Sequence, residues 1–444
     1  MSDLLLSGGT LVNEGKFSEN DVLVRNGRIE NIGASIAAPK GCEILDLSGK
    51  LILPGLIDDQ VHFREPGLTH KACIHTESQA AVAGGVTTFF EMPNVSPPTL
   101  SMERIEEKCA IAAKDSLANY AFFLGASNEN LESVKAADPT KIAGIKVFMG
   151  SSTGNMLVDE ASVLEGIFRN APTIIATHCE DTPSIHKNEE IARQKYGEDV
   201  PFSEHGKIRS REACIKSSSL AVELALREKA KLHVLHITTM EELDLFKPGD
   251  QQITAEACVH HLWFEESQYD SLGSLIKCNP AIKTVNDRNA IRQAVKDGRI
   301  SVLATDHAPH TWDEKMGNYF NAPSGLPLIQ HTLLLMLEMV KEKCFSLETV
   351  VERACHAPAR LFQVVDRGFI REGYWADLVV VDPDQQTVVQ DSQLFSKCGW
   401  SPFSEMKFSH SIHSTIVSGT IAYQMGRLNL NNRGQRAKFE SIRR

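Results

Sequence analysis

Two hydrophobic patterns alternate through the middle of the chain. Short apolar runs rich in β-branched residues are separated by longer segments with helical periodicity, such as residues 101–116, 212–229 and 286–297. The apolar runs are eight in number and cover residues 57–63, 85–92, 120–125, 142–149, 173–179, 232–237, 252–257 and 300–305. Eight strands alternating with helices, apolar enough to be buried on both faces, predict an α/β fold with a (β/α)8 TIM barrel. We place this barrel at residues 54–366.

The two ends of the chain show a different pattern, with short strands and turn residues. Asn26-Gly27 separates two strand-like runs and is a strong hairpin signal. Further strand-like runs are residues 10–12, 21–25, 28–32, 378–381, 414–417 and 419–423. We therefore expect a small composite β-sandwich domain built from residues 1–53 and 367–427. Residues 428–444 are polar and basic, and the sequence leaves open whether this C-terminal extension is docked or loose.

Composition and charge narrow the class of protein. The net charge of −11 argues against a nucleic-acid-binding surface, although a few arginines can still make one cleft attractive to a small anion. The 10 cysteines are dispersed without close pairs, which favours reduced and mostly buried thiols. No segment has the length of a membrane span, and the first residues lack the pattern of a signal peptide. We therefore expect a cytoplasmic protein that does not bind membranes.

Potential metal ligands stand at the ends of several predicted strands. In a barrel, these positions face the active site. They are Gln60, His62, Glu91, Asn94, Lys146, His178, His236 and Asp306. A single buried histidine is usually a packing residue, but imidazoles and a carboxylate on four different strands are hard to explain by packing. Such donors bind Zn²⁺ or a similar ion, which activates water and polarises a carbonyl.

Gln60 and Lys146 are unusual residues for a metal site. Gln60 and His62 are two residues apart on a strand and share a face, but glutamine is a weak neutral ligand. A charged Lys146 is unfavourable beside a metal ion, so its amine is either neutral or converted by CO₂ to a carbamate that bridges two metals. The alternative is a lysine that extends to solvent. The sequence favours neither.

These residues lie in motifs through which the chain resembles the dihydroorotase branch, class I type, of the amidohydrolase superfamily. The resemblance covers about residues 4–427. The most specific stretch is Asp58-Asp59-Gln60-Val61-His62-Phe63-Arg64-Glu65-Pro66-Gly67, and the others are residues 68–71, 84–88, 92–94, 277–280 and 304–310. The resemblance implies reversible, metal-dependent cyclisation of N-carbamoyl-L-aspartate to L-dihydroorotate, a step of pyrimidine biosynthesis.

The resemblance also implies roles for individual residues. His62, Lys146, His178, His236 and Asp306 are the implied ligands of one or two Zn²⁺ ions, with Lys146 at the position that many relatives carboxylate. Asp306 is in addition the implied general base. The implied substrate-binding residues are Arg64, Asn94, Asn279 and His310, with a bidentate arginine suited to a free carboxylate. Residues 311–323 form a candidate active-site loop, whose alternative interpretation is a plain surface connection.

The chain departs from the family at Gln60, where most members have histidine. The metal that uses His62 and Asp306 should therefore be weakened, which leaves two metals, one metal, or a catalytically silent relative. Some silent relatives support aspartate carbamoyltransferase, so association with that enzyme belongs to the third case. Another cyclic amidohydrolase, of the allantoinase or hydantoinase type, is a further alternative, although Arg64 favours a substrate with a carboxylate. Relatives are often dimers, so we expect a homodimer.

The remaining histidines carry weaker expectations. Most of them, His233 included, have no partner pattern and are expected to be surface or packing residues. His260 and His261 follow the seventh strand run and are candidates for contact with the metal ligands.

Overall fold

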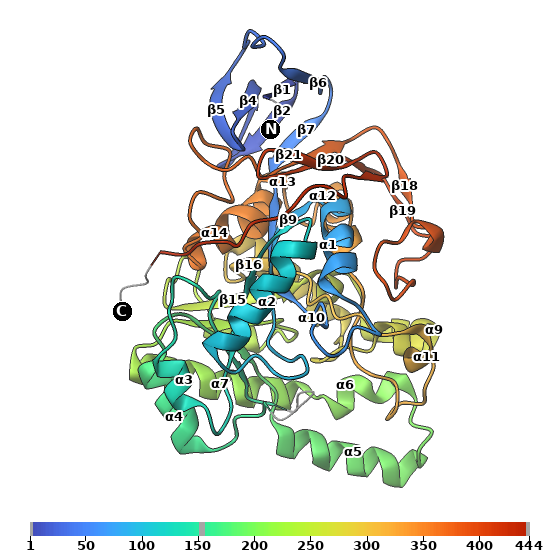
Figure 1. Cartoon of the computed structure of the whole chain (residues 1–444). Helices are drawn as coiled ribbons and strands as arrows, with labels where there is room; N and C mark the ends of the chain where they lie inside the picture. The colour runs from blue at the N-terminus through green and yellow to red at the C-terminus, as the bar shows by residue number, and fades with distance from the viewer. Residues whose placement is uncertain (1–2, 151–155, 441–444) are drawn as a thin grey trace.

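The computed structural model describes residues 3–150 and 156–440. Figure 1 shows a large body of strands and helices with a smaller β domain above it. The strands of the large body are β8 (Leu56–Val61), β9 (Val86–Glu91), β10 (Asn119–Phe122) with its continuation β11 (Leu124–Gly125), β12 (Ile145–Phe148), β13 (Ile175–His178), β14 (Leu232–Val234), β15 (Ile253–Cys258) and β16 (Val302–Ala304). Neighbouring strands pair in parallel in this order. The ring closes where His62 N donates to His307 O at 2.7 Å. The predicted barrel is confirmed.

Helices connect these strands. The longer ones are α1 (Ile74–Ala83), α2 (Met102–Asp115), α4 (Ala161–Asn170), α5 (Thr182–Tyr196), α7 (Arg211–Glu228), α10 (Val285–Asp297) and α12 (Thr332–Lys341). The shorter ones are α3 (Leu131–Lys135), α6 (His205–Ile208), α8 (Val259–Trp263), α9 (Tyr269–Leu272), α11 (Trp312–Lys315), α13 (Leu347–Val351) and α14 (Ala357–Leu361). Helix α10 shows why they form. Thr284 and Asp287 cap its start, Gly298 with φ +90° follows its end, and Ile291 and Val295 are buried at helical spacing.

The β domain combines strands from both ends of the chain. One sheet contains β1 (Leu4–Ser7), β4 (Asp21–Arg25), β5 (Arg28–Gly33) and β6 (Glu43–Asp46). The other contains β2 (Thr10–Asn13), β3 (Lys16–Glu19), β7 (Leu51–Pro54), β17 (Leu378–Asp382), β20 (Ser411–Val417), β21 (Thr420–Gln424) and β22 (Arg427–Leu428). Asn26 and Gly27, with φ +53° and +80°, make the predicted hairpin turn between β4 and β5. A separate pair, β18 (Thr387–Val388) and β19 (Lys407–Phe408), lies in the excursion between β17 and β20.

The C-terminal segment is docked as far as residue 440. Tyr120 N donates to Gln435 O at 3.0 Å, and Ala437 N donates to Tyr120 O at 2.8 Å, so this segment runs along β10. The Phe439 ring lies 5.6 Å from that of Phe90 and belongs to the same buried cluster as Phe362. In Figure 1 the segment crosses the barrel to reach α14. It therefore completes the hydrophobic interior of the barrel.

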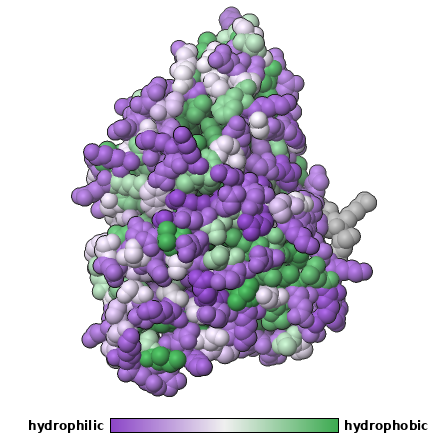
Figure 2. Space-filling view, turned by 180° about the vertical axis from the view of Figure 1, so that it is seen from behind, coloured by the Kyte–Doolittle hydropathy of each residue, from purple (hydrophilic) through white to green (hydrophobic). Residues whose placement is uncertain are grey.

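The outer surface is mixed. The face in Figure 2 is mainly hydrophilic, with separate hydrophobic patches in the upper middle of the view and to the right of centre in its lower half. Among the described residues, no helix is both long and apolar enough to cross a membrane.

Candidate metal and substrate site

A polar pocket of about 240 Å³ opens at the carboxyl ends of the barrel strands. The site residues expected from the sequence, except Glu91, line it, namely Gln60, His62, Arg64, Asn94, Lys146, His178, His236, Asn279, Asp306 and His310. Five further lining residues were not expected, namely Phe148, Arg209, Ala308, Ser324 and Gly325. Glu91 is turned away from the pocket and pairs with Lys108 at 2.7 Å, so it contributes to packing instead.

The first group of potential ligands consists of His62 and Asp306. His62 Nδ1 donates to Asn94 Oδ1 at 2.8 Å, which leaves Nε2 with a lone pair. That nitrogen lies 3.0 Å from Asp306 Oδ1. Burial lowers the pKa of His62 and favours its neutral form, so a lone pair faces a carboxylate. A cation between these atoms would remove the conflict, and the pair therefore fits a metal ion.

Gln60 changes this group. Its Nε2 donates to Asp306 Oδ1 at 3.2 Å, and its Oε1 accepts from Cys258 Sγ at 3.8 Å. The amide nitrogen that faces Asp306 has no lone pair for a metal. In this arrangement Gln60 orients Asp306 rather than adding a ligand.

The second group consists of His178 and His236. His178 Nδ1 and His236 Nε2 are 3.0 Å apart, while His178 Nε2 lies 3.0 Å from Glu180 Oε2. Burial opposes ionisation of Glu180, but the charge of Arg209 and the contact with His178 lower the pKa of Glu180 to about 2. Arg209 Nη1 donates to Glu180 Oε2 at 2.5 Å. A carboxylate that holds the outer nitrogen of an imidazole is the usual support of a histidine metal ligand.

Lys146 lies on β12 and is 1 % exposed. The alternative in which its side chain extends to solvent is therefore wrong. Burial lowers the pKa of Lys146 to about 8, and its Nζ lies 4.7 Å from the centre of the Phe148 ring. The neutral amine is therefore easier to reach than in an exposed lysine, in keeping with either of the two remaining interpretations.

Arg64 and His310 form a wall of the pocket that is cationic through the guanidinium of Arg64. Arg64 is 4 % exposed, its Nε donates to Pro309 O at 3.1 Å, and its Nη2 lies 3.0 Å from His310 Nε2. Lys71 Nζ lies 3.0 Å from His310 Nδ1. Burial and the charges of Arg64 and Lys71 hold the pKa of His310 well below its usual range, so His310 is neutral between two cations. A buried wall of this kind attracts an anion.

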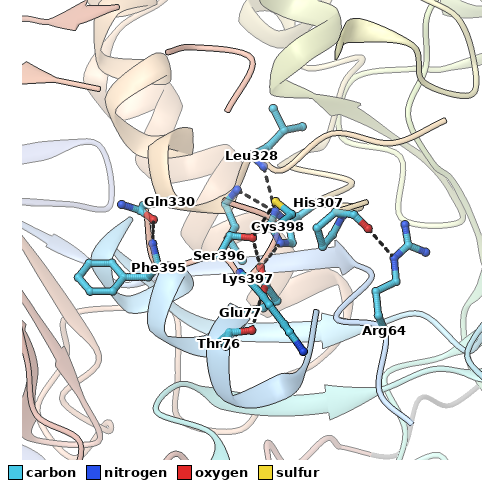
Figure 3. Close-up of polar contacts among 12 residues, drawn as sticks. Arg64, Thr76, Glu77, His307, Leu328, Gln330, Phe395, Ser396, Lys397 and Cys398 are labelled. Carbon is cyan, nitrogen blue, oxygen red and sulfur yellow. Dashed lines mark hydrogen bonds and ion pairs between the residues drawn. The ribbon is translucent and has the colours of Figure 1, made fainter. Parts of the chain in front are cut away.

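A buried carboxylate behind this wall fixes the segment that carries Asp306 and His310. Glu77 on α1 lies 2.8 Å from His307 Nε2 and accepts from the hydroxyl of Ser396 at 2.5 Å (Figure 3). His307 Nδ1 accepts from Leu328 N at 2.9 Å. Since both ring nitrogens of His307 are engaged, it is a positioning residue.

Three pocket residues have left-handed backbone conformations. Arg64, His236 and Asp306 have φ values of +69°, +41° and +49°. Such conformations are unfavourable for residues other than glycine and persist where the surroundings hold them. They turn the chain away from the strand direction at the points where these side chains enter the pocket.

Comparisons of sequence place the chain among known proteins. A model of the amidohydrolase family matches residues 51–422. A dihydroorotase from Halobacterium salinarum is 34% identical over 406 residues, covering 91% of this chain and 93% of that protein. A dihydroorotase from Pyrococcus abyssi is 31% identical over 437 residues, covering 98% of each chain.

Solved structures with the same fold are also known. An L-hydantoinase (dihydropyrimidinase) from Arthrobacter aurescens superposes with a TM-score of 0.93 at 24% identity and covers 99% of this chain and 100% of its own. A dihydropyrimidinase from Brevibacillus agri gives a TM-score of 0.89 at 21% identity, with 100% of both chains covered. At this identity the likeness concerns the fold alone. The amidohydrolase family model matches most of this chain, and a relative is 34% identical over 91% of it. This chain therefore belongs to the amidohydrolase family.

Proposed function

We propose that this protein, a cyclic amide hydrolase, is a dihydroorotase that interconverts N-carbamoyl-L-aspartate and L-dihydroorotate. The observation that carries the proposal is the cationic wall of Arg64 and His310 beside the imidazole groups of the same pocket. A cyclic amide with a free carboxylate matches both parts. Relatives at 34% and 31% identity that bear the name dihydroorotase support the same substrate.

The residues present fit metal ions of the zinc class. His178, His236 and Lys146 would hold one ion, and His62 and Asp306 would hold a second more weakly, because Gln60 adds no ligand there. When bound, the metal would supply Lewis-acid polarisation of the ring carbonyl. We also propose that Lys146 reacts with CO₂, with loss of a proton, to form a carbamate ligand. Its burial and its pKa, lowered to about 8, support this step.

The chain's own residues would bind and orient the ring. Arg64, Asn94 and His310 would hold the substrate carboxylate, and Asn279 would contact the ring amide. Ser324 Oγ already donates to Asn279 Oδ1 at 3.0 Å, so the Asn279 side chain is oriented before substrate binds. In ring opening, Asp306 would take a proton from the attacking water and return it to the leaving nitrogen. Ring closure is the reverse.

Two other functions would use the same pocket. A hydantoinase-like or allantoinase-like activity would use the same barrel on a ring without a carboxylate. A catalytically silent subunit of aspartate carbamoyltransferase would keep the pocket without turnover, and Gln60 is the residue that favours it. We propose a homodimer for the active form. We also propose that the β domain consists of residues 1–53 and 367–427, the barrel of residues 54–366 and the C-terminal extension of residues 428–444.

One experiment separates these functions. The purified protein would be assayed with N-carbamoyl-L-aspartate, dihydroorotate, hydantoin and allantoin while its metal content is counted on the same sample. We expect turnover of the first two compounds and its loss with a chelator. Turnover of hydantoin or allantoin alone would replace the substrate assignment. A folded, metal-loaded protein with no turnover would favour the silent subunit. Mass spectrometry of the intact chain would detect the carbamate directly.

A further inference from the structure

A second polar cluster lies inside the barrel and does not line the pocket. Its members are Asp59 on β8, His233 on β14 and Glu256 on β15, and each is 0% exposed. His233 Nε2 lies 3.3 Å from Asp59 Oδ2 and 3.8 Å from Glu256 Oε2. The Phe362 ring packs against the His233 ring at 5.8 Å. We call these three residues the inner cluster.

The inner cluster has buried polar atoms without hydrogen bonds. They are both carboxylate oxygens of Asp59, Glu256 Oε2 and His233 Nε2. Although His233 Nε2 is close to Asp59, the two atoms are not hydrogen-bonded. The adjacent Asp58 shows that the barrel can satisfy a buried carboxylate, since Asp58 accepts from Thr305 Oγ1 at 2.6 Å and from Thr305 N at 3.2 Å. Unsatisfied charge at this depth is costly, so the inner cluster requires a counter-charge.

Neighbouring groups form hydrogen bonds with the outer polar atoms of His233 and Glu256, so the atoms without hydrogen bonds face one another. The Thr254 hydroxyl donates to Leu232 O at 3.1 Å, so it accepts from His233 Nδ1 at 2.8 Å. His233 Nε2 is therefore the ring nitrogen that faces the two carboxylates. Burial opposes a charge on this ring, but the contacts with Asp59 and Glu256 raise the pKa of His233 to about 9, so Nε2 carries a proton when no ion is bound. Glu256 Oε1 accepts from His236 N at 3.1 Å and from Cys258 Sγ at 3.2 Å, which leaves Oε2 free. One ligand atom from each of the three residues lies within 4.8 Å of the other two.

We propose that the inner cluster binds a divalent transition-metal ion, separate from any metal in the pocket. The ion would take the place of the proton on His233 Nε2, and the two carboxylates with the imidazole then neutral carry a charge of −2, which one divalent ion balances. Mixed oxygen and imidazole donors suit Zn²⁺, Mn²⁺ or Fe²⁺, whereas Ca²⁺ requires six or more oxygen ligands. The hydrogen bond from His233 Nδ1 to Thr254 and the contacts of Glu256 Oε1 are the outer support that metal ligands usually have. The ion ties strands β8, β14 and β15 together. This proposal does not depend on the substrate of the pocket.

Metal retention tests the proposal. The full chain, produced with Zn²⁺ or Mn²⁺ in the medium, would be dialysed against a chelator under native conditions and its metal counted. Since the inner cluster is closed to solvent, we expect about one ion per chain to remain. Asp59→Asn should lose that ion. Asp58→Asn, which makes the same substitution at the neighbouring residue, should keep it. If Asp59→Asn retained as much metal per chain as the unaltered protein, the proposal would be overturned.

A second measurement needs no variant and decides the case if Asp59→Asn does not fold. Crystals of the unaltered protein would be measured at the absorption edge of the retained metal. We expect an anomalous peak about 2.0–2.2 Å from Asp59, His233 Nε2 and Glu256 Oε2. Cys258, His260 and His261 also bring ligand atoms together nearby. A peak on those three residues, or no peak inside the barrel, would mean that protons neutralise the inner cluster.

Discussion

Replacing Arg64 by methionine tests the binding of the substrate carboxylate. The guanidinium is 4 % exposed, and burial lowers its pKa to about 10, so it is still charged at neutral pH. A buried, charge-assisted contact that loses one partner costs about 2–5 kcal/mol. At about 1.4 kcal/mol for each factor of ten, the kcat/KM for N-carbamoyl-L-aspartate should fall by about 30-fold to several thousand-fold. Methionine fills much of the same volume without a buried charge, so the fold should persist.

The assay compares two substrates on the same Arg64→Met preparation. Steady-state cyclisation of N-carbamoyl-L-aspartate measures the loss, and any measurable opening of hydantoin, which has no carboxylate, serves as the control. Arg64→Lys keeps the charge but not the planar pair of donors. Its kcat/KM for N-carbamoyl-L-aspartate should therefore lie between those of the unaltered protein and Arg64→Met. A folded Arg64→Met that keeps kcat/KM within about threefold of the unaltered protein would refute the reasoning, because no charged contact of this burial is worth so little.

Three further predictions concern other parts of the molecule. Gln60→His should raise the zinc affinity of the His62 and Asp306 position by roughly 10-fold or more, as measured by zinc titration; an unchanged affinity would contradict the role given to Gln60. Glu180, whose pKa falls from 4.5 to about 2 on folding, should add about 3 kcal/mol of stability above pH 4.5 that is lost as the pH falls to 2. Urea unfolding should therefore show a smaller difference in the free energy of unfolding between the unaltered protein and Glu180→Gln at pH 3 than at pH 5. An equal difference at both pH values would be evidence against the ion pair. Phe439→Ala should lower the free energy of unfolding by about 3–5 kcal/mol, and a change under 1 kcal/mol would mean that the docked segment adds little.

The barrel could be predicted because its strands are buried on both faces and read as continuous apolar runs. Their ends were less visible. The predicted strand at 232–237 stops at Val234, since His236 has a left-handed φ of +41° that ends the extended run. The docking of residues 429–440 also escaped prediction, because one phenylalanine among polar residues gives no periodic signal. Its position depends on contacts with β10, far away in the sequence.

The imidazoles, Lys146 and Asp306 could be predicted because parallel strands bring their carboxyl ends to the same side of the barrel, whereas Arg64, Asn279 and His310 came from the family resemblance alone. Glu180 carried a usable signal, since it lies two residues after His178. Arg209 carried none, as it enters the pocket from the connection between α6 and α7 rather than from a strand. The expectation that His233 only packs is incomplete, because its neighbours Asp59 and Glu256 come from separate strands and no local pattern joins them.

The pairing of β7 with β17 has a consequence for the rate of folding. Leu51 and Val381 are partners in this antiparallel pair, and the whole barrel sequence lies between them. Such a contact closes a very long loop, so its entropic cost is met only after the intervening chain has collapsed. The barrel should therefore gain structure before this sheet does, and hydrogen exchange during refolding should protect β9 and β15 earlier than β7 and β17.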